Sequence, residues 1–140
     1  MKIAWIVPLA LAAGLAGCAA TPREAANLPP PPPSGAGLAA GQCFRTHDIR
    51  SHTVADDHTL LLSVGQRDVY RVTLRGGCLA GASSSDPIIT EQPPGSQITC
   101  RPLDLDLSIA TAGATSRCIV DSIAKLSPEQ AAALPGRLRP

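Results

Sequence analysis

Alternating apolar and polar residues mark one stretch of the chain as a strand. The alternation runs over seven consecutive positions: Leu103, Asp104, Leu105, Asp106, Leu107, Ser108 and Ile109. Because successive side chains of a strand point to opposite faces, the leucines and the isoleucine should face a core, and the aspartates should face water.

A second alternation predicts a hairpin. Apolar residues recur at every other position in residues 60–64 and 70–74, and the polar run 65–68 between them suits a turn. Arg71, Thr73 and Arg75 then lie on the other, wet face. An irregular strand over 43–54, with Asp56 and Asp57 as a turn, completes an up-down-up meander.

The end of the domain is marked by a helix cap. Residues 117–125 form a last strand with Cys118 and Val120 on one face. Ser127, Pro128 and Gln130 supply an N-cap, a first-position proline and a capping box for a short helix through Leu134, which Pro135 ends. Shorter extended segments are expected at 87–90 and 97–100, with a turn at 93–95.

These elements predict an all-β fold. Strands joined by short turns, without long helices, are typical of sandwiches and small barrels. We expect a mostly antiparallel, barrel-like sheet of five or six strands with a short C-terminal helix, spanning residues 42–134, followed by a tail, 135–140.

The N-terminus reads as a lipoprotein signal peptide, residues 1–17. Its apolar run, 3–15, is shorter than the ~20 residues of a spanning helix. Residues 15–18 read Leu-Ala-Gly-Cys, which resembles a lipobox, so Cys18 is predicted to carry the lipid as the first mature residue. Ala19 favours the outer membrane, facing the periplasm. An ordinary secretory signal cut elsewhere is the alternative.

A tether is predicted for residues 18–41. The segment is rich in Pro, Gly and Ala, has five consecutive prolines at 29–33, and shows no periodicity. Such prolines favour an extended polyproline II spacer. A ligand for a proline-binding domain is the other interpretation.

Four cysteines remain in the domain: Cys43, Cys78, Cys100 and Cys118. An even number in an oxidising compartment indicates two disulfides, and the wide spacing argues against a four-cysteine zinc site. The meander places Cys43 and Cys78 at opposite ends of the sheet. We therefore expect Cys78 to pair with Cys100, and Cys43 with Cys118.

The densest group of potential ligands is His47, His52, Asp56, Asp57 and His58. His47 and His52 are an odd number of residues apart, so on a regular strand they point to opposite faces. A solvated strand and turn is the favoured interpretation, and a metal or acid/base site is the alternative.

Other candidates are weaker. Serines 83–85 lack the surroundings of a nucleophile elbow, and Asp104 and Asp106 lie ~7 Å apart on a wet face where nothing would raise a pKa. Arg71 and Arg75 share a side and could contact an anion, although solvation is the default. No nucleotide-binding loop is present.

Composition excludes further classes. The chain has 12 Lys and Arg against 11 Asp and Glu, and removal of Lys2 with the signal leaves a net charge of zero. Nucleic-acid binding is therefore not expected. With Trp5 also removed, Phe44 and Tyr70 are the only aromatic residues.

Several motifs resemble a family of small Gram-negative envelope proteins known only as a domain of unknown function. They are Cys43-Phe44, residues 56–60, 70–74 with Gly77-Cys78, 98–100, 117–120 and 125–129. The resemblance implies a secreted or lipidated, disulfide-bonded β domain, with no activity to carry over.

Together these features predict a non-enzymatic envelope lipoprotein. It would be a binding or structural module with an envelope protein partner, anchored by the lipid on Cys18, without metal or other cofactor. An inhibitor of a cell-wall-lytic enzyme, and a metal-binding or enzymatic protein that uses residues 47–58, are the alternatives.

Overall fold

A computed structural model of the chain describes residues 28–91 and 97–140. The described chain forms eight strands, one α-helix and three short 3-10 helices. The strands are β1 (Phe44–Arg45), β2 (Ile49–Asp56), β3 (Thr59–Val64), β4 (Asp68–Arg75), β5 (Ile88–Glu91), β6 (Ile98–Thr99), β7 (Asp106–Thr111) and β8 (Ala114–Lys125). The helices are η2 (Thr46–Asp48), η3 (Pro102–Asp104), α1 (Pro128–Ala132) and η4 (Gly136–Leu138).

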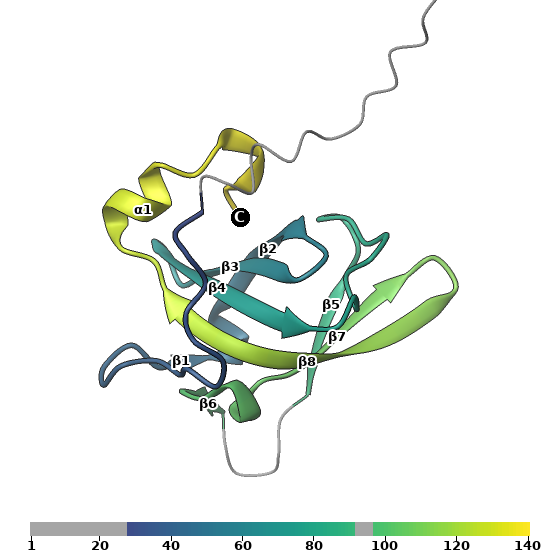
Figure 1. Ribbon diagram of the computed structural model, residues 1–140, viewed down its shortest axis with the longest axis horizontal. Helices are drawn as coiled ribbons and strands as arrows, with labels where there is room; N and C mark the ends of the chain where they lie inside the picture. The colour runs from purple at the N-terminus through teal and green to yellow at the C-terminus, as the bar shows by residue number, and fades with distance from the viewer. Residues whose placement is uncertain (1–27, 92–96) are drawn as a thin grey trace, which may run out of the picture.

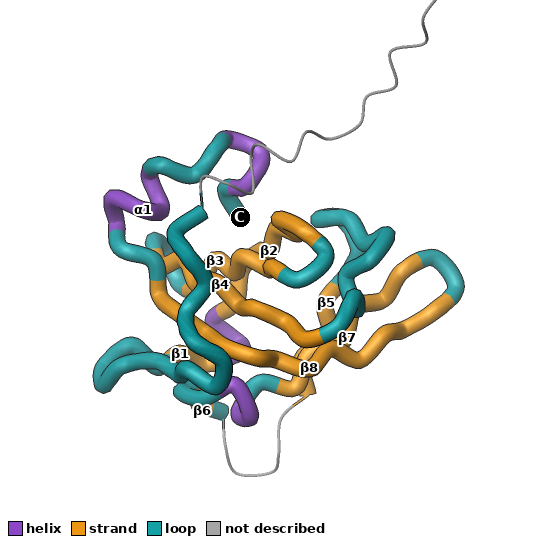
Figure 2. The backbone as a smooth tube through the Cα atoms, viewed as in Figure 1, coloured by secondary structure: helices purple, strands orange, loops and turns teal. Residues whose placement is uncertain are grey.

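Six strands form one antiparallel sheet in the order β2-β3-β4-β8-β7-β5, and β1 pairs with β6 beside it. The sheet curls into a half-barrel (Figures 1 and 2). The all-β prediction is therefore confirmed, as is the up-down-up meander, although η2 divides the first predicted strand, 43–54, into β1 and β2. The short strand predicted over 87–90 is β5, residues 88–91.

The curl depends on the long strand β8. Its first part pairs with β7, and its second part pairs with β4. The register between β4 and β8 shifts by one residue at Asp121, between Val120 and Ser122. Such a bulge bends a strand and increases its twist, which lets one strand serve both halves of the sheet.

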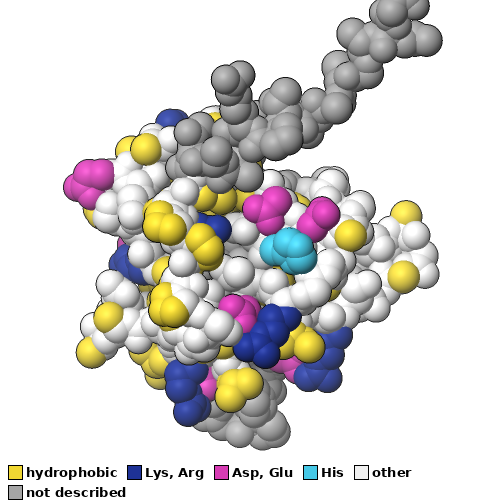
Figure 3. Space-filling view, viewed as in Figure 1, with side chains coloured by type: hydrophobic (Ala, Val, Ile, Leu, Met, Phe, Trp, Pro, Cys, Tyr) yellow, Lys and Arg dark blue, Asp and Glu magenta, His cyan; other side chains and the backbone are white. Residues whose placement is uncertain are grey.

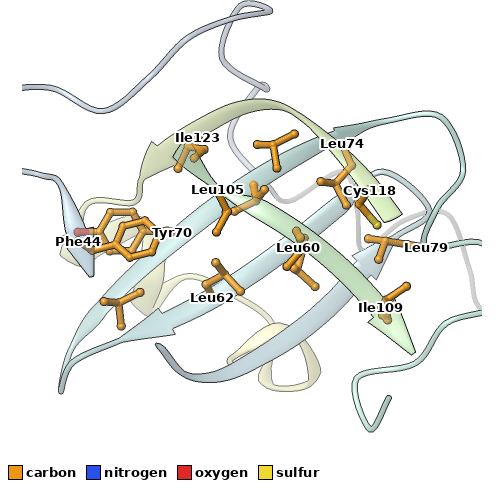
Figure 4. Packing of buried hydrophobic residues seen from close by; sticks show 14 residues of the cluster. Phe44, Leu60, Leu62, Tyr70, Leu74, Leu79, Leu105, Ile109, Cys118 and Ile123 are labelled. Atoms are coloured by element: carbon orange, nitrogen blue, oxygen red, sulfur yellow. The ribbon is translucent and has the colours of Figure 1, made fainter. Parts of the chain in front are cut away.

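The inner face of the sheet holds the main core, as the alternation predicts. Leu60, Leu62, Val72 and Leu107 are fully buried there, and Phe44 packs on Tyr70 with ring centroids 4.6 Å apart (Figure 4). The Tyr70 hydroxyl donates to the Gln42 carbonyl at 2.9 Å, so the ring's polar group is satisfied.

The outer face is covered as well, which the sequence did not indicate. Leu61 is fully buried in a second cluster with Leu28, Leu126, Leu134 and Leu138, residues from both ends of the described chain. Arg71, predicted to be on a wet face, is only 7% exposed and donates to the Pro29 carbonyl. The hairpin therefore has no fully wet face.

The folded unit extends beyond the predicted boundaries of 42 and 134. Residues 28–38, here called the N-terminal strap, run along β8 (Figure 1). Gly35 N–H donates to the Asp121 carbonyl at 2.9 Å, and Ile123 N–H donates to the Ala36 carbonyl at 3.0 Å. Gly35 and Ala36 follow the prolines and have both N–H and carbonyl groups, so this part of the strap can both donate to β8 and accept from it.

The C-terminal residues 135–140 are likewise part of the fold rather than a free tail. The capping box of Ser127 and Gln130 opens α1 as predicted. Leu138 of η4 is buried, and Arg139 donates to the carbonyls of Ala132 and Leu134, both at 3.0 Å. These bonds satisfy carbonyls that the end of α1 leaves free.

The predicted disulfide pairing is wrong. Cys43 pairs with Cys100, with Cα atoms 4.6 Å apart, and Cys78 pairs with Cys118, with Cα atoms 5.4 Å apart. The reason is β5, which carries the chain back across the sheet before Cys100. β7 then returns the chain to the end that holds Cys78, where β8 and Cys118 follow.

The strand predicted over 103–109 begins later. Residues 102–104 form the 3-10 helix η3, in which Pro102 stands near the start and Asp104 accepts from the Arg101 N–H at 2.8 Å. Leu105, Leu107 and Ile109 are buried as expected, but Leu103 is 89% exposed rather than inward. The predicted signal peptide, Cys18 and the turn at 93–95 lie outside the described residues.

Candidate functional site

The three histidines lie on different elements. His47 is in η2, where its ring is 3.6 Å from the Asp48 carboxylate; His52 is on β2; and His58 is in the turn between β2 and β3. Within residues 28–91 and 97–140, no three His, Cys, Asp or Glu side chains come together as a metal site would require.

His58 and Asp56 have local structural contacts. Asp56 Oδ1 accepts from the His58 N–H at 2.8 Å, as aspartates do in turns. The His58 Nδ1 atom is 2.8 Å from the Gly76 carbonyl, so the ring joins the β2–β3 turn to the end of β4. Asp57 is exposed in the same turn.

The serine run and the paired aspartates also have structural contacts. Ser83 bonds to Asp86 through its N–H at 2.7 Å, and Ser84 Oγ accepts from the Val54 N–H at 3.0 Å. Asp104 is in η3 and not on the strand of Asp106, so the two do not form the predicted pair on one strand face.

The clearest candidate site is an exposed apolar surface at the end of the sheet near η3. Leu103 is 89% exposed and Ile119 is 64% exposed. Pro102 and Val120 are themselves buried and line a groove of about 340 Å³ together with these two side chains. We call this surface, formed by Pro102, Leu103, Ile119 and Val120, the apolar patch.

Local structure explains why Leu103 and Ile119 are exposed. Leu103 is placed on η3 by the turn that Pro102 and Asp104 stabilise, which lifts it off the line of β7. Ile119 is on the outer side of β8, opposite Arg75. The strap covers β8 at residues 121–123, as the bonds of Gly35 and Ala36 show, and leaves Ile119 uncovered.

Three arginine–aspartate pairs surround the apolar patch. Arg75 bonds to Asp121 at 2.6 Å, Arg101 to Asp104 at 2.9 Å, and Arg117 to Asp106. We call Arg75, Arg101 and Arg117 the arginine rim. Figure 3 shows one face of the molecule, and in the lower part of the view basic, acidic and apolar side chains lie next to one another.

The two partners of each pair differ in exposure. The arginine side chains are 62–75% exposed, whereas the aspartate side chains are 17–27% exposed. The carboxylates are largely occupied by internal donors. Asp104 accepts from the N–H groups of Cys100 and Arg101, and Asp121 accepts from the Ser34 hydroxyl at 2.6 Å. The patch therefore presents guanidinium groups to the outside.

These contacts also favour the ionised form of two of the carboxylates, Asp104 and Asp121. Hydrogen bonds from the Ser34 hydroxyl and the Arg75 guanidinium lower the pKa of Asp121. Hydrogen bonding from the Arg101 side chain is the main cause that lowers the pKa of Asp104. Arg75 and Arg101 thus stay oriented by charged partners at neutral pH.

Sequence reasoning missed this surface. Leu103 was placed in the core because it continues the alternation of residues 105–109. The sequence Arg101-Pro102-Leu103-Asp104 contains the missed signal, since a proline followed two residues later by an aspartate suits a tight helical turn. Ile119 could have been found, because it lies on the opposite strand face from Cys118 and Val120.

The described residues contain no helix that is long and apolar enough to span a membrane. The sequence model of a family of unknown function, DUF6491, matches residues 1–139. The chain belongs to this family. No curated protein and no solved structure matches this DUF6491 member. The resemblance to a domain of unknown function is thus confirmed.

Proposed function

We propose that this DUF6491 member is a lipid-anchored, non-enzymatic module of the bacterial envelope that binds a protein partner through its apolar patch. The observation that supports this role is the exposure of Leu103 and Ile119 inside the arginine rim. Exposed apolar side chains surrounded by polar ones are typical of protein–protein contact sites, and arginine is enriched there.

Rigidity supports the same role. The two disulfides join Cys43 to Cys100 and Cys78 to Cys118, and Cys118 is next to Ile119 on β8. A binding surface held by covalent closures loses little conformational freedom when a partner binds.

The strap gives the module an orientation. If Cys18 carries the lipid, only the nine residues 19–27 separate it from Leu28, which is buried on the domain. The ten residue-to-residue steps from Cys18 to Leu28 span at most ~36 Å, so the domain would be held near the membrane. The strap leads from Leu28 toward η3 (Figure 1), so with a lipid on Cys18 the apolar patch would lie at the end of the domain opposite the anchored end.

The alternatives have less support. An inhibitor of a cell-wall-lytic enzyme would be a special case of the same binding role. A metal-binding or enzymatic role would have to use His47, His52 and His58, which lie on separate elements.

Localisation and partner capture test the proposal together. The wild-type chain should be recovered in the outer-membrane fraction, whereas Cys18→Ala should remain as an unprocessed or soluble precursor, because the thioether forms only on sulfur. Normal membrane recovery and processing of Cys18→Ala would contradict the lipid anchor.

Photo-crosslinkable residues are placed one at a time at the exposed positions 89, 98, 103 and 119 of the full chain, and those in the apolar patch, 103 and 119, should capture one reproducible envelope protein. Lys125 is the only lysine after residue 17, and it is paired with Asp68, so amine-directed crosslinkers suit this chain poorly. The absence of any specific adduct at all four positions would overturn the binding role. A hydrolytic activity of the purified domain that His58→Ala abolishes would favour the enzymatic alternative.

A further inference from the structure

The surroundings of the apolar patch indicate the chemistry of its partner. We infer that the patch binds a protein segment in which an apolar side chain is flanked by carboxylates. The apolar side chain would pack on Leu103 and Ile119, and the carboxylates would bond to the arginine rim. This inference rests on the proposed binding role of the apolar patch and assigns that patch a class of partner.

The charge argument begins with the unequal exposure of the three ion pairs. Although each pair is neutral, its aspartate is less exposed than its arginine. Asp104 also accepts from two backbone N–H groups, and Asp121 accepts from the Ser34 hydroxyl. Each guanidinium has five donors. Arg117 bonds to Asp106 through Nη2, and Arg75 bonds to Asp121 and Ser34 through Nε and Nη2. Donors therefore remain for acceptors on an approaching molecule.

Arginine is well suited to this task. Its planar group can engage one carboxylate on the protein and a second on a partner, and it is less strongly hydrated than an ammonium group. The internal aspartates hold each guanidinium in place before binding. Less side-chain entropy is then lost when the partner arrives.

The centre of the surface requires an apolar group. Leu103 projects from η3 and Ile119 from β8, on either side of a groove that Val120 and Pro102 also line. A purely anionic ligand would leave these aliphatic groups in water. A ligand that covers them while its carboxylates reach the rim gains from both hydrophobic burial and charge-assisted bonds.

A protein fits this surface better than a glycan or a membrane. Sugars are commonly held on aromatic rings, yet Phe44 and Tyr70 are both buried in the core. An anionic membrane would satisfy the arginines. However, the strap directs the apolar patch away from the end at which the chain would be anchored (Figure 1).

The test uses the full lipidated chain with a photo-crosslinkable side chain at position 119 or, as a control, at position 89. Ile89 is 42% exposed on β5 and is not part of the groove. We expect adducts from position 119 and not from position 89. The crosslinked segment of the captured protein, read by mass spectrometry, should contain an apolar residue with Asp or Glu on both sides.

Affinity of the purified captured protein then decides the chemistry. Ile119→Asp and Arg117→Glu should each weaken binding about tenfold or more, and Ile89→Asp should leave it unchanged. Binding should also weaken as salt increases, because the rim contributes charge pairs. Exchanging the partner's acidic residue for lysine should restore binding to Arg117→Glu. Thermal melts of each variant establish that it is folded.

Several results would overturn the inference. Capture from position 89 alone would show binding through another face and would contradict the apolar patch as the binding surface. If the partner segment crosslinked to position 119 contained no acidic residue, the proposed partner chemistry would be refuted. Unchanged affinity of Ile119→Asp would refute it as well. Ile119-dependent binding to phosphatidylglycerol vesicles would assign the patch to a membrane, and adducts between two copies of the chain would assign it to self-association.

Discussion

The two faces of the curled sheet are buried by different means. On the inner face, strand residues pack on one another, and two disulfides close the structure around them. On the outer face, Leu61 is covered by Leu28 of the strap and by Leu126, Leu134 and Leu138 near the C-terminus. The inner face is thus built by the sheet itself, and the outer face depends on the two ends of the described chain.

This difference implies two levels of stability. The inner core can open only if paired strands and covalent closures are disrupted. The outer cluster can open when the strap or the C-terminal segment detaches, because neither is held by a disulfide. Regions with fewer buried apolar contacts commonly open first in native proteins.

The largest expected effect is removal of a disulfide from the inner side. Cys78→Ser with Cys118→Ser removes a closure of 40 residues, and Cys43→Ser with Cys100→Ser removes one of 57. In the chain-entropy model each closure stabilises the fold by about 4 kcal/mol. Urea unfolding of the oxidised protein and both variants measures this. Losses below about 1 kcal/mol in both would show that the inner face does not need its closures, and non-reducing peptide mapping checks the pairing.

The second prediction compares the truncation of one leucine on each face of the sheet. Leu62→Ala on the inner face should lower the free energy of unfolding by about 3–5 kcal/mol, since it leaves a cavity in a closed core. Leu134→Ala should cost about 2 kcal/mol and mainly increase hydrogen exchange at Leu126 and in α1, because that region can open alone. Equal loss of protection in β3 from both variants would show that the faces unfold as one unit.

A smaller effect comes from the strap itself. A Cβ atom at Gly37 would lie 2.7 Å from the Cys100 carbonyl oxygen, so Gly37→Ala must displace the strap and should cost about 1–3 kcal/mol. Gly136→Ala is the matched control, because a Cβ there meets no atom within 4 Å. Thermal melts of the two variants give the comparison. A neutral Gly37→Ala would mean that the strap is not held against residue 100.

The smallest effect concerns the pH dependence of the bond between strap and sheet. The pKa of Asp121 is lowered by the Ser34 hydroxyl and then by Arg75. A lowered pKa in the folded state stabilises the protein above the ordinary carboxyl pKa of ~4, and this contribution is lost as the pH falls through the folded value. In Asp121→Asn the free energy of unfolding should therefore decrease less steeply as the pH falls below ~4.

The control for that measurement is Asp57→Asn in the exposed β2–β3 turn. Its free energy of unfolding should decrease with falling pH as that of the wild-type protein does. If Asp121→Asn also left this decrease unchanged, the strap would not be held through this carboxylate.

Much of the fold could be predicted from short-range patterns. The alternation in residues 60–64 and 70–74 predicted β3 and β4, and the Ser127 capping box predicted the start of α1, because both depend on neighbours within a few residues. The exposure of Leu103 was mispredicted because two short-range patterns compete there: the alternation of residues 103–109 and the tight turn at Pro102, and the turn prevails. The candidate site was missed for that reason.

By itself, the sequence determined the strand pattern, the helix cap, the use of four cysteines in two disulfides and membership of the DUF6491 family. Only the tertiary structure decided which cysteines pair, that the strap and the C-terminus bury the outer face, and that Leu103 and Ile119 meet beside three arginines. Disulfide pairing depends on how many times the chain crosses the sheet between cysteines. The crossing by β5 brings Cys100 to the end that holds Cys43, so these two pair. Contacts between residues far apart in the chain leave no local periodicity, so packing in three dimensions alone determines them.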